Sequence, residues 1–206
     1  MFVYNPLPIK AWEFVEPGTI IRNFIAQPKQ FVRILLDSGE VIIAKKHDTA
    51  RADSGTGRLY GAEGECKAFF SLTSNGLNQI KPVWSTAMEK GEGGSKYPSL
   101  RHFCDENRPN GILCHHAMYE IWHGPRDPEC HIHHLNGDKF DNCENNLIEL
   151  KAKIEHPNAD ARQRLVRSVV GDLHLLSHAR LRELTLMPNN TFLHELESLR
   201  KQYEQA

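Results

Sequence analysis

The chain has 206 residues, of which 40% are hydrophobic and 25% are charged, and its formal net charge is -1. These values are typical of a globular protein that buries a core, and they exclude wholesale disorder. The nearly equal numbers of acidic and basic residues also exclude a uniformly basic surface. A nucleic-acid partner would therefore have to meet a local cluster of Lys and Arg.

The sequence predicts a protein of a reduced compartment that does not enter a membrane. No apolar run is long enough to span a bilayer, and the first residues lack the basic segment and long apolar core of a secretory signal. The cysteines are odd in number and form no CxxC pair, which argues against a disulfide framework. They are Cys66, Cys104, Cys114, Cys130 and Cys143. We therefore expect a cytoplasmic protein.

The amino-terminal part, residues 1–87, is predicted to be rich in β structure. Residues 19–25 are largely β-branched and aromatic, and the apolar runs 31–36 and 41–44 flank an Asp-Ser-Gly-Glu turn, which indicates a hairpin. Residues 46–65 are polar and glycine-rich, and we interpret them as a long loop. The sequence assigns no role to this region.

A glycine-rich linker over residues 88–96 separates this part from a second unit that begins at Tyr97. In that unit we expect a strand over 97–104, a return strand over 112–115 and a short helix over 117–122. The helix should end at His123-Gly124-Pro125, because glycine and proline terminate helices.

The last part of the chain, residues 161–206, is predicted to form a helical tail. An amphipathic pattern over 159–170 precedes Gly171. Ser177 can cap a second helix, and Asn190 or Thr191 can cap a third. Two helices joined by a short turn are compatible with a DNA-reading pair and equally with any helical hairpin. The whole chain is therefore predicted to be α+β.

One stretch carries most of the functional signal, the doublet His133-His134 followed by Asn136-Gly137. Phosphodiester cleavage needs a base that takes a proton from water near neutral pH, and it needs a cation beside the phosphate. Adjacent side chains in a regular strand point to opposite faces, so two neighbouring histidines can share a task only where the strand breaks. Asn136-Gly137 is such a breaker.

Residues after the doublet complete a possible metal site. Asn146, just before the apolar run 147–150, can fix the loop or hold the base through its carbonyl oxygen. His156 comes at the expected start of a helix and would lie close to the doublet once the two strands pair. Glu155 and Asp160 are near enough in sequence to compete with His156 for the metal.

These residues resemble the HNH endonuclease family, in particular its phage and mobile-element members, whose site is a β-hairpin followed by a helix around one metal ion. The segment 115–125 resembles the stretch that precedes the doublet in that family. The resemblance covers residues 97–160 and implies a ββα-metal HNH nuclease core there. It further implies that the protein hydrolyses DNA phosphodiester bonds with a divalent metal as its cofactor.

Site roles follow from the same resemblance. By position, His134 would be the general base, His133 a metal ligand, Asn146 the middle catalytic residue of the motif and His156 the final ligand. Mg²⁺ is the expected ion, although imidazole ligands suit Mn²⁺, Ni²⁺ or Zn²⁺ better. The basic residues expected to contact DNA are Lys139, Arg162 and Arg164.

Two other functions fit the sequence. The chain could be a non-catalytic DNA-binding protein that retains the HNH scaffold. Alternatively, it could be a structural zinc-binding module in which Cys104, Cys114 and Cys130 act with a histidine.

Overall fold

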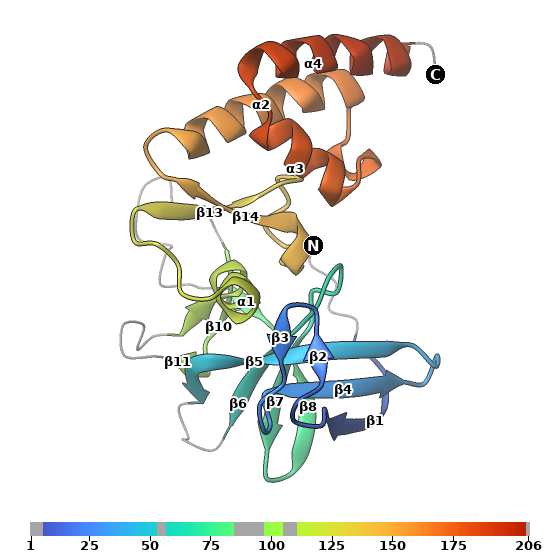
Figure 1. The fold of residues 1–206 in the computed structure, drawn as a ribbon, viewed down its shortest axis with the longest axis vertical. Helices are drawn as coiled ribbons and strands as arrows, with labels where there is room; N and C mark the ends of the chain where they lie inside the picture. The colour runs from blue at the N-terminus through green and yellow to red at the C-terminus, as the bar shows by residue number, and fades with distance from the viewer. Residues whose placement is uncertain (1–5, 53–56, 85–96, 105–110, 205–206) are drawn as a thin grey trace. The chain divides into compact units, whose positions relative to one another are not determined.

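A computed structural model describes residues 6–52, 57–84, 97–104 and 111–204. Within these ranges the fold is α+β, with helices and a large antiparallel sheet (Figure 1). No described helix is both long and apolar enough to cross a membrane. The predicted linker, 88–96, lies outside the described residues.

The chain divides into two compact units. The first, which we call the sheet unit, comprises Met1–Pro125 together with Asn142–Glu144. The second, which we call the hairpin–helix unit, comprises Arg126–Asp141 and Asn145–Ala206. Each is described by itself below.

The sheet unit is built on a seven-stranded antiparallel sheet in the order β1-β4-β5-β6-β7-β8, with β11 pairing to β5. Its strands are β1 (Ile9–Phe14), β4 (Phe31–Leu36), β5 (Val41–Ala52), β6 (Arg58–Ala62), β7 (Phe69–Thr73), β8 (Gly76–Ile80) and β11 (Phe103–Cys104). Smaller sheets join β2 (Ile20–Ile21) to β3 (Phe24–Ile25), and β10 (Pro98–Leu100) to β9 (Val83–Trp84) and β12 (Ile112–Leu113).

The predicted hairpin of β4 and β5 is confirmed, with Ile34 opposite Ile42 and Val32 opposite Ala44. The prediction of a long loop over 46–65 was wrong. Strand β5 continues to Ala52, and β6 follows, because the backbone of this polar segment pairs with β6 and with β11. Polar composition did not reveal these strands, since their pairing partners lie elsewhere in the chain.

Helix α1 (Cys114–His123) packs on β5 and β6 of the same unit. Gly61 makes a close approach possible, since a Cβ atom there would lie 2.7 Å from Ile121 and 3.0 Å from Met118. The Trp122 indole donates to the carbonyl of Ala62 at 3.1 Å. As predicted, the helix ends at Gly124, whose φ is +92°. The predicted return strand is shorter than expected, because the helix already begins at Cys114.

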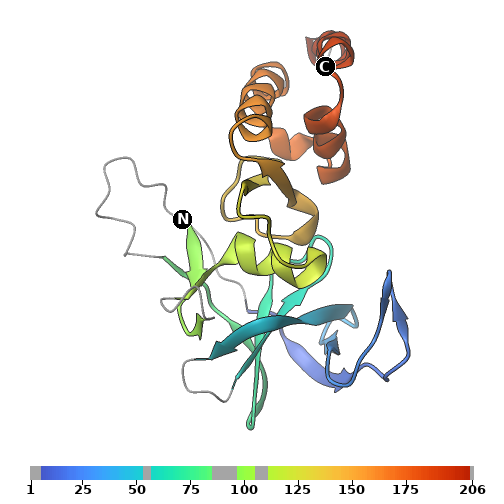
Figure 2. The ribbon, with the colours of Figure 1, turned by 60° about the vertical axis from the view of Figure 1, so that its left-hand side comes forward.

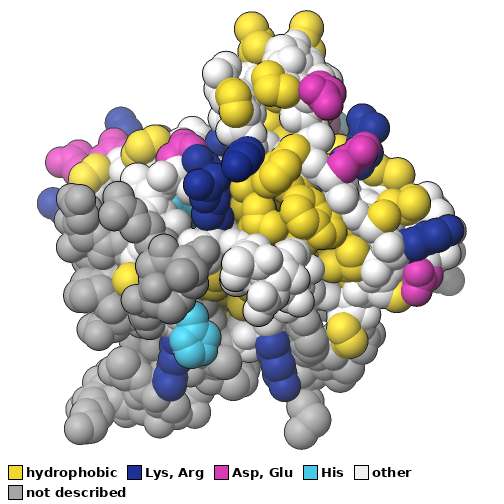
Figure 3. All heavy atoms as spheres, turned by 90° about the horizontal axis from the view of Figure 1, so that it is seen from below, with side chains coloured by type: hydrophobic (Ala, Val, Ile, Leu, Met, Phe, Trp, Pro, Cys, Tyr) yellow, Lys and Arg dark blue, Asp and Glu magenta, His cyan; other side chains and the backbone are white. Residues whose placement is uncertain are grey.

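The surface of the sheet unit is mixed in character. Figure 3 shows hydrophobic side chains gathered beside Lys and Arg side chains on the face seen from below. Among the described residues of this unit, the large hydrophobic side chains that are exposed include Ile20, Ile25 and Val41.

The described residues of the hairpin–helix unit form a β-hairpin, three α-helices and a short 3-10 helix, η3 (Leu173–Leu175). The strands and α-helices are β13 (Cys130–His134), β14 (Leu147–Lys151), α2 (Glu155–Val170), α3 (His178–Leu186) and α4 (Asn189–Glu204). Helix α2 packs on the hairpin, and α4 runs beside α2 (Figures 1 and 2). The cap by Ser177 is confirmed, because its hydroxyl accepts from the Arg180 backbone at 3.2 Å.

One hydrophobic core joins the hairpin to all three helices. It contains Leu135, Ile148, Leu150, Ala159, Val166, Val170, Leu173, Leu181, Leu184, Phe192 and Leu199. A two-stranded hairpin is marginal alone, and the helices supply the apolar surface that it needs. The helices after residue 160 therefore complete the core of the hairpin.

The boundaries between the two compact units fall at other positions in the chain than the predicted segment boundaries. Residues 97–125 belong with the sheet, because α1 buries its apolar face against β5 and β6. The predicted boundary between residues 160 and 161 falls inside α2. The packing of α1 on strands that are remote in sequence accounts for the first difference.

Candidate metal centre

The histidine doublet occupies the last two positions of β13. His133 pairs with Ile148 and His134 with Leu147. The strand ends there as predicted, with a turn in which Gly137 N donates to the His134 carbonyl at 3.0 Å. The two imidazoles therefore leave opposite faces of the hairpin, and His133 is the one that faces α2.

His133 meets two side chains of the first turns of α2. Its Nδ1 atom lies 3.3 Å from Asp160 Oδ1, and Asp160 Oδ2 lies 3.3 Å from His156 Nδ1. The rings of His133 and His156 are perpendicular, with centroids 5.1 Å apart. One donor atom from each of the three residues lies within 4.8 Å of the others.

Helix geometry explains this convergence. His156 and Asp160 are four residues apart, so they project from one face of α2 about one turn apart. His131 lies two positions before His133 on the same face of β13, and its ring contacts His156 at a centroid distance of 5.3 Å. The sequence analysis treated His156 and Asp160 as alternatives for one metal-ligand position, but the structure places both beside His133. Their i, i+4 spacing was the signal for a shared role.

The pKa of His133 is lowered from its ordinary value to about 4. Burial is the largest cause, since the side chain is 5% exposed, and His156 and His134 act in the same direction. Asp160 opposes the shift. At neutral pH the imidazole is therefore uncharged, which is the form that binds a metal ion.

Glu155 is turned away from this cluster. Its carboxylate accepts from the backbone N–H of Lys151 at 2.9 Å, so it fixes the connection between β14 and α2. Of the three predicted alternatives for the last ligand, the structure brings His156 and Asp160 to His133 and gives Glu155 this other contact.

Asn146 holds the connection between the two strands. Its side chain is fully buried, and its Oδ1 accepts from the Asn136 backbone at 3.0 Å. Its amide donates to Asn136 Oδ1 at 2.9 Å and to the Asp141 carbonyl at 2.8 Å. These contacts match the loop-fixing role that the sequence allowed. The catalytic role that the resemblance implies for Asn146 stays a prediction.

The predicted DNA-contacting residues have different environments. Arg164 is exposed on α2, and Lys139 lies partly buried in the loop between the strands. Arg162 instead binds within the unit, donating to the Thr185 carbonyl at 2.7 Å and to Asn189 Oδ1 at 2.5 Å. Its guanidinium also covers the Phe192 ring at 4.9 Å. Arg162 is therefore held by partners within its own unit, and its contact with DNA stays a prediction.

The cysteines predicted for a zinc module do not converge. Among the described residues, no group of metal-ligating side chains includes Cys104, Cys114 or Cys130. Burial raises the pKa of the Cys114 thiol far above its ordinary value, which disfavours a metal-binding thiolate.

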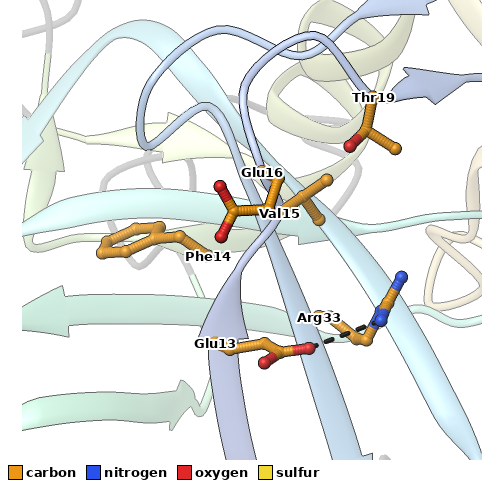
Figure 4. Close-up of a pocket in the computed structure, with 6 residues that line it drawn as sticks. All are labelled: Glu13, Phe14, Val15, Glu16, Thr19 and Arg33. Atoms are coloured by element: carbon orange, nitrogen blue, oxygen red, sulfur yellow. Dashed lines mark hydrogen bonds and ion pairs between the residues drawn. The ribbon is translucent and has the colours of Figure 1, made fainter.

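A surface hollow in the sheet unit holds none of the candidate site residues. It is lined by Glu13, Phe14, Val15, Glu16, Thr19 and Arg33 (Figure 4). Within it, Arg33 Nη1 lies 3.4 Å from Glu13 Oε1, and both side chains are more than half exposed. A solvent-screened pair of this kind contributes little.

No protein-family model matches this chain, and neither the curated proteins nor the solved structures contain a match to it. The chemistry that the centre can support therefore has to be inferred from its own residues.

Proposed function

We propose that this protein is a metal-dependent DNA endonuclease of the HNH type, whose active site is the centre formed by β13, β14 and α2. One observation carries the proposal. A histidine from the hairpin and a histidine and a carboxylate from the following helix converge within 4.8 Å, and a second histidine, His134, follows His133 in the same strand.

The donor set suits a divalent cation. Imidazole nitrogen and carboxylate oxygen are both common ligands of such ions. His133 Nδ1 lies 3.3 Å from one oxygen of Asp160 and His156 Nδ1 lies 3.3 Å from the other. Two imidazoles with one carboxylate favour Zn²⁺, Ni²⁺ or Mn²⁺ over Mg²⁺, which prefers oxygen ligands.

The proposal gives each residue a distinct task. His133, His156 and Asp160 would hold the ion, which supplies positive charge to offset the charge that develops on the phosphate and on the leaving oxygen. His134 is the next residue of β13 after His133, and in this proposal it would accept the proton of the attacking water. Arg164, exposed on the ligand-bearing helix, would bind a DNA phosphate.

A plasmid-cleavage assay tests the proposal. Supercoiled DNA is incubated with the full chain in EDTA and then with Mg²⁺, Mn²⁺, Ni²⁺ or Zn²⁺, and the nicked and linear products are quantified. We expect cleavage with at least one of these ions and none in EDTA. His134→Ala should reduce the rate by about 100-fold or more, which is the size of a general-base contribution.

The matched control is His194→Ala, which removes an exposed imidazole on α4 and should leave the rate unchanged. Cleavage that persists in His134→Ala would refute the assigned base. DNA binding without cleavage under every metal would refute the enzyme and favour a non-catalytic DNA-binding protein.

A further inference from the structure

We propose that Gln163 and Arg167 are positioning residues that hold the end of β13 against α2 and thereby set the geometry of the metal centre. We call this pair the clasp. The inference rests on the proposed function, because it assigns to the clasp the placement of His133 relative to His156 and Asp160.

The side chains of the clasp donate hydrogen bonds to three consecutive backbone carbonyl groups at the end of β13. The Gln163 amide donates to the carbonyls of His134 at 2.7 Å and Leu135 at 3.0 Å. Arg167 Nη2 donates to the carbonyl of Asn136 at 3.3 Å. Leu135 and Asn136 lie beyond the last pair of the β13–β14 register, His134 with Leu147. The N–H groups of Leu135 and Asn136 still donate to Asn146, whereas α2 supplies the donors for the carbonyl groups of Leu135 and Asn136.

The clasp and the metal ligands share one face of α2. Gln163 follows Asp160 by three residues and Arg167 follows it by seven, and both spacings return to the same side of a helix. The Gln163 amide nitrogen also lies 3.4 Å from His133 Nε2. One rigid helix face therefore carries two candidate ligands and also holds the strand that carries the third.

Gly137 leaves room for the clasp. Its φ is +74°, and a Cβ atom added there would lie 2.7 Å from Arg167 Nη2 and 3.1 Å from Gln163 Oε1. A larger residue would meet both a strained backbone and the two clasp side chains. The Asn-Gly turn thus ends the strand and also admits the two side chains that fix its position.

The positions of metal ligands are usually set by groups that touch them rather than by the ligands alone. Here the contacts of the clasp are directional hydrogen bonds, whereas Leu135 and Ile148 contribute apolar contacts that allow small shifts. Loss of the clasp should therefore let His133 move relative to His156 and Asp160 while the core persists.

Metal binding by the full chain tests this inference without any need for nuclease activity. Co²⁺ is titrated into the protein, its dissociation constant is measured, and its visible absorption spectrum reports the coordination geometry. For Gln163→Ala, for Gln163→Glu and for Arg167→Ala we expect Co²⁺ affinity to fall about 10- to 100-fold and the spectrum to change. Arg167→Lys, which keeps a donor, should recover part of the loss.

Ser168→Ala is the matched control, because Ser168 is exposed on α2 and bonds only within its own helix, to the Leu165 carbonyl. Thermal unfolding in EDTA shows whether each variant remains folded. If Gln163→Ala does not fold, the comparison of Arg167→Lys with Arg167→Ala decides the question.

Wild-type affinity and spectrum in folded clasp variants would overturn the inference and leave the proposed function intact. A loss of affinity without a spectral change, equal in Arg167→Lys and Arg167→Ala, would also overturn it by pointing to general destabilisation. Absence of metal binding by the unmodified chain would refute the proposed function itself, a result distinguishable from the others.

Discussion

The Nδ1 atom of His133 lies 3.3 Å from Oδ1 of Asp160, which joins the end of a strand to the second turn of a helix. The other carboxylate oxygen of Asp160 lies at the same distance from His156. Asp160 therefore bridges the two imidazoles, and the carboxylate rather than either histidine is the common member of the cluster.

This arrangement predicts that Asp160→Asn weakens metal binding, while Glu155→Gln does not. The first change removes the negative charge shared by both imidazoles, and we expect an affinity loss of about 10-fold or more for Zn²⁺. The second change alters a residue whose contact is the Lys151 backbone. Isothermal titration calorimetry of the two isosteric variants provides the comparison. Equal losses of Zn²⁺ affinity in the two variants would contradict the assignment of Asp160 as a metal ligand.

The pKa of His133 predicts a pH dependence of stability for the metal-free protein. Folding lowers this pKa from its ordinary value of 6.5 to about 4, so the unfolded chain binds a proton more readily than the folded chain. The contribution of His133 is fully present above pH 6.5 and is lost as the pH falls towards 4, by up to about 3 kcal/mol.

Urea unfolding in EDTA, measured from pH 7.5 to pH 4, checks this prediction. The His133→Ala variant should show a shallower decline over the same window, because the shifted group is missing. Parallel curves for the two proteins would mean that other groups cause the decline.

Asn146→Ala should destabilise the protein by about 2–4 kcal/mol, because it leaves the Asn136 backbone N–H and the Asp141 carbonyl without their buried partner. Asn158→Ala, at an exposed position of α2, serves as its control and should change stability by less than about 0.5 kcal/mol. Both values come from urea unfolding. Wild-type stability of Asn146→Ala would show that the amide does not hold the loop.

We expect alanine substitutions of Arg162 and Arg164 to have different effects, the first on stability and the second on DNA binding. Arg162→Ala removes hydrogen bonds to the end of α3 and the cover over Phe192, and we expect a stability loss of about 1–2 kcal/mol. Arg164→Ala should leave stability unchanged, weaken binding to duplex DNA and lower the salt slope by about one. Fluorescence anisotropy at several salt concentrations measures the slope, and an unchanged slope would exclude a phosphate contact by Arg164.

Local signals predicted the features that depend on neighbouring residues. Glycine at 124 and 171 ended helices, Ser177 began one, and the strand stopped at the doublet. The approach of His156 to His133 was also foreseen, because pairing of the strands brings the start of α2 to the doublet. Backbone chemistry acts over a few residues, so these features can be read from the sequence.

Features that depend on distant partners could not be read in this way. The strand character of residues after Lys45 comes from pairing with β6 and β11. The engagement of Arg162 depends on where α3 ends. The contact of Gln163 depends on the end of β13, which lies 29 residues away in sequence. In each case the partner is remote in sequence, and no local pattern marks the contact.

Helix α2 uses two neighbouring faces. One carries His156 and Asp160, and the other contributes Ala159, Val166 and Val170 to the core that Phe192 and Leu199 complete. The candidate metal centre uses no side chain beyond Arg167, yet the helix that carries two of its residues packs against Phe192 and Leu199 of α4. A chain truncated before α4 would keep His133, His156 and Asp160 but would lose the packing that holds α2 in place.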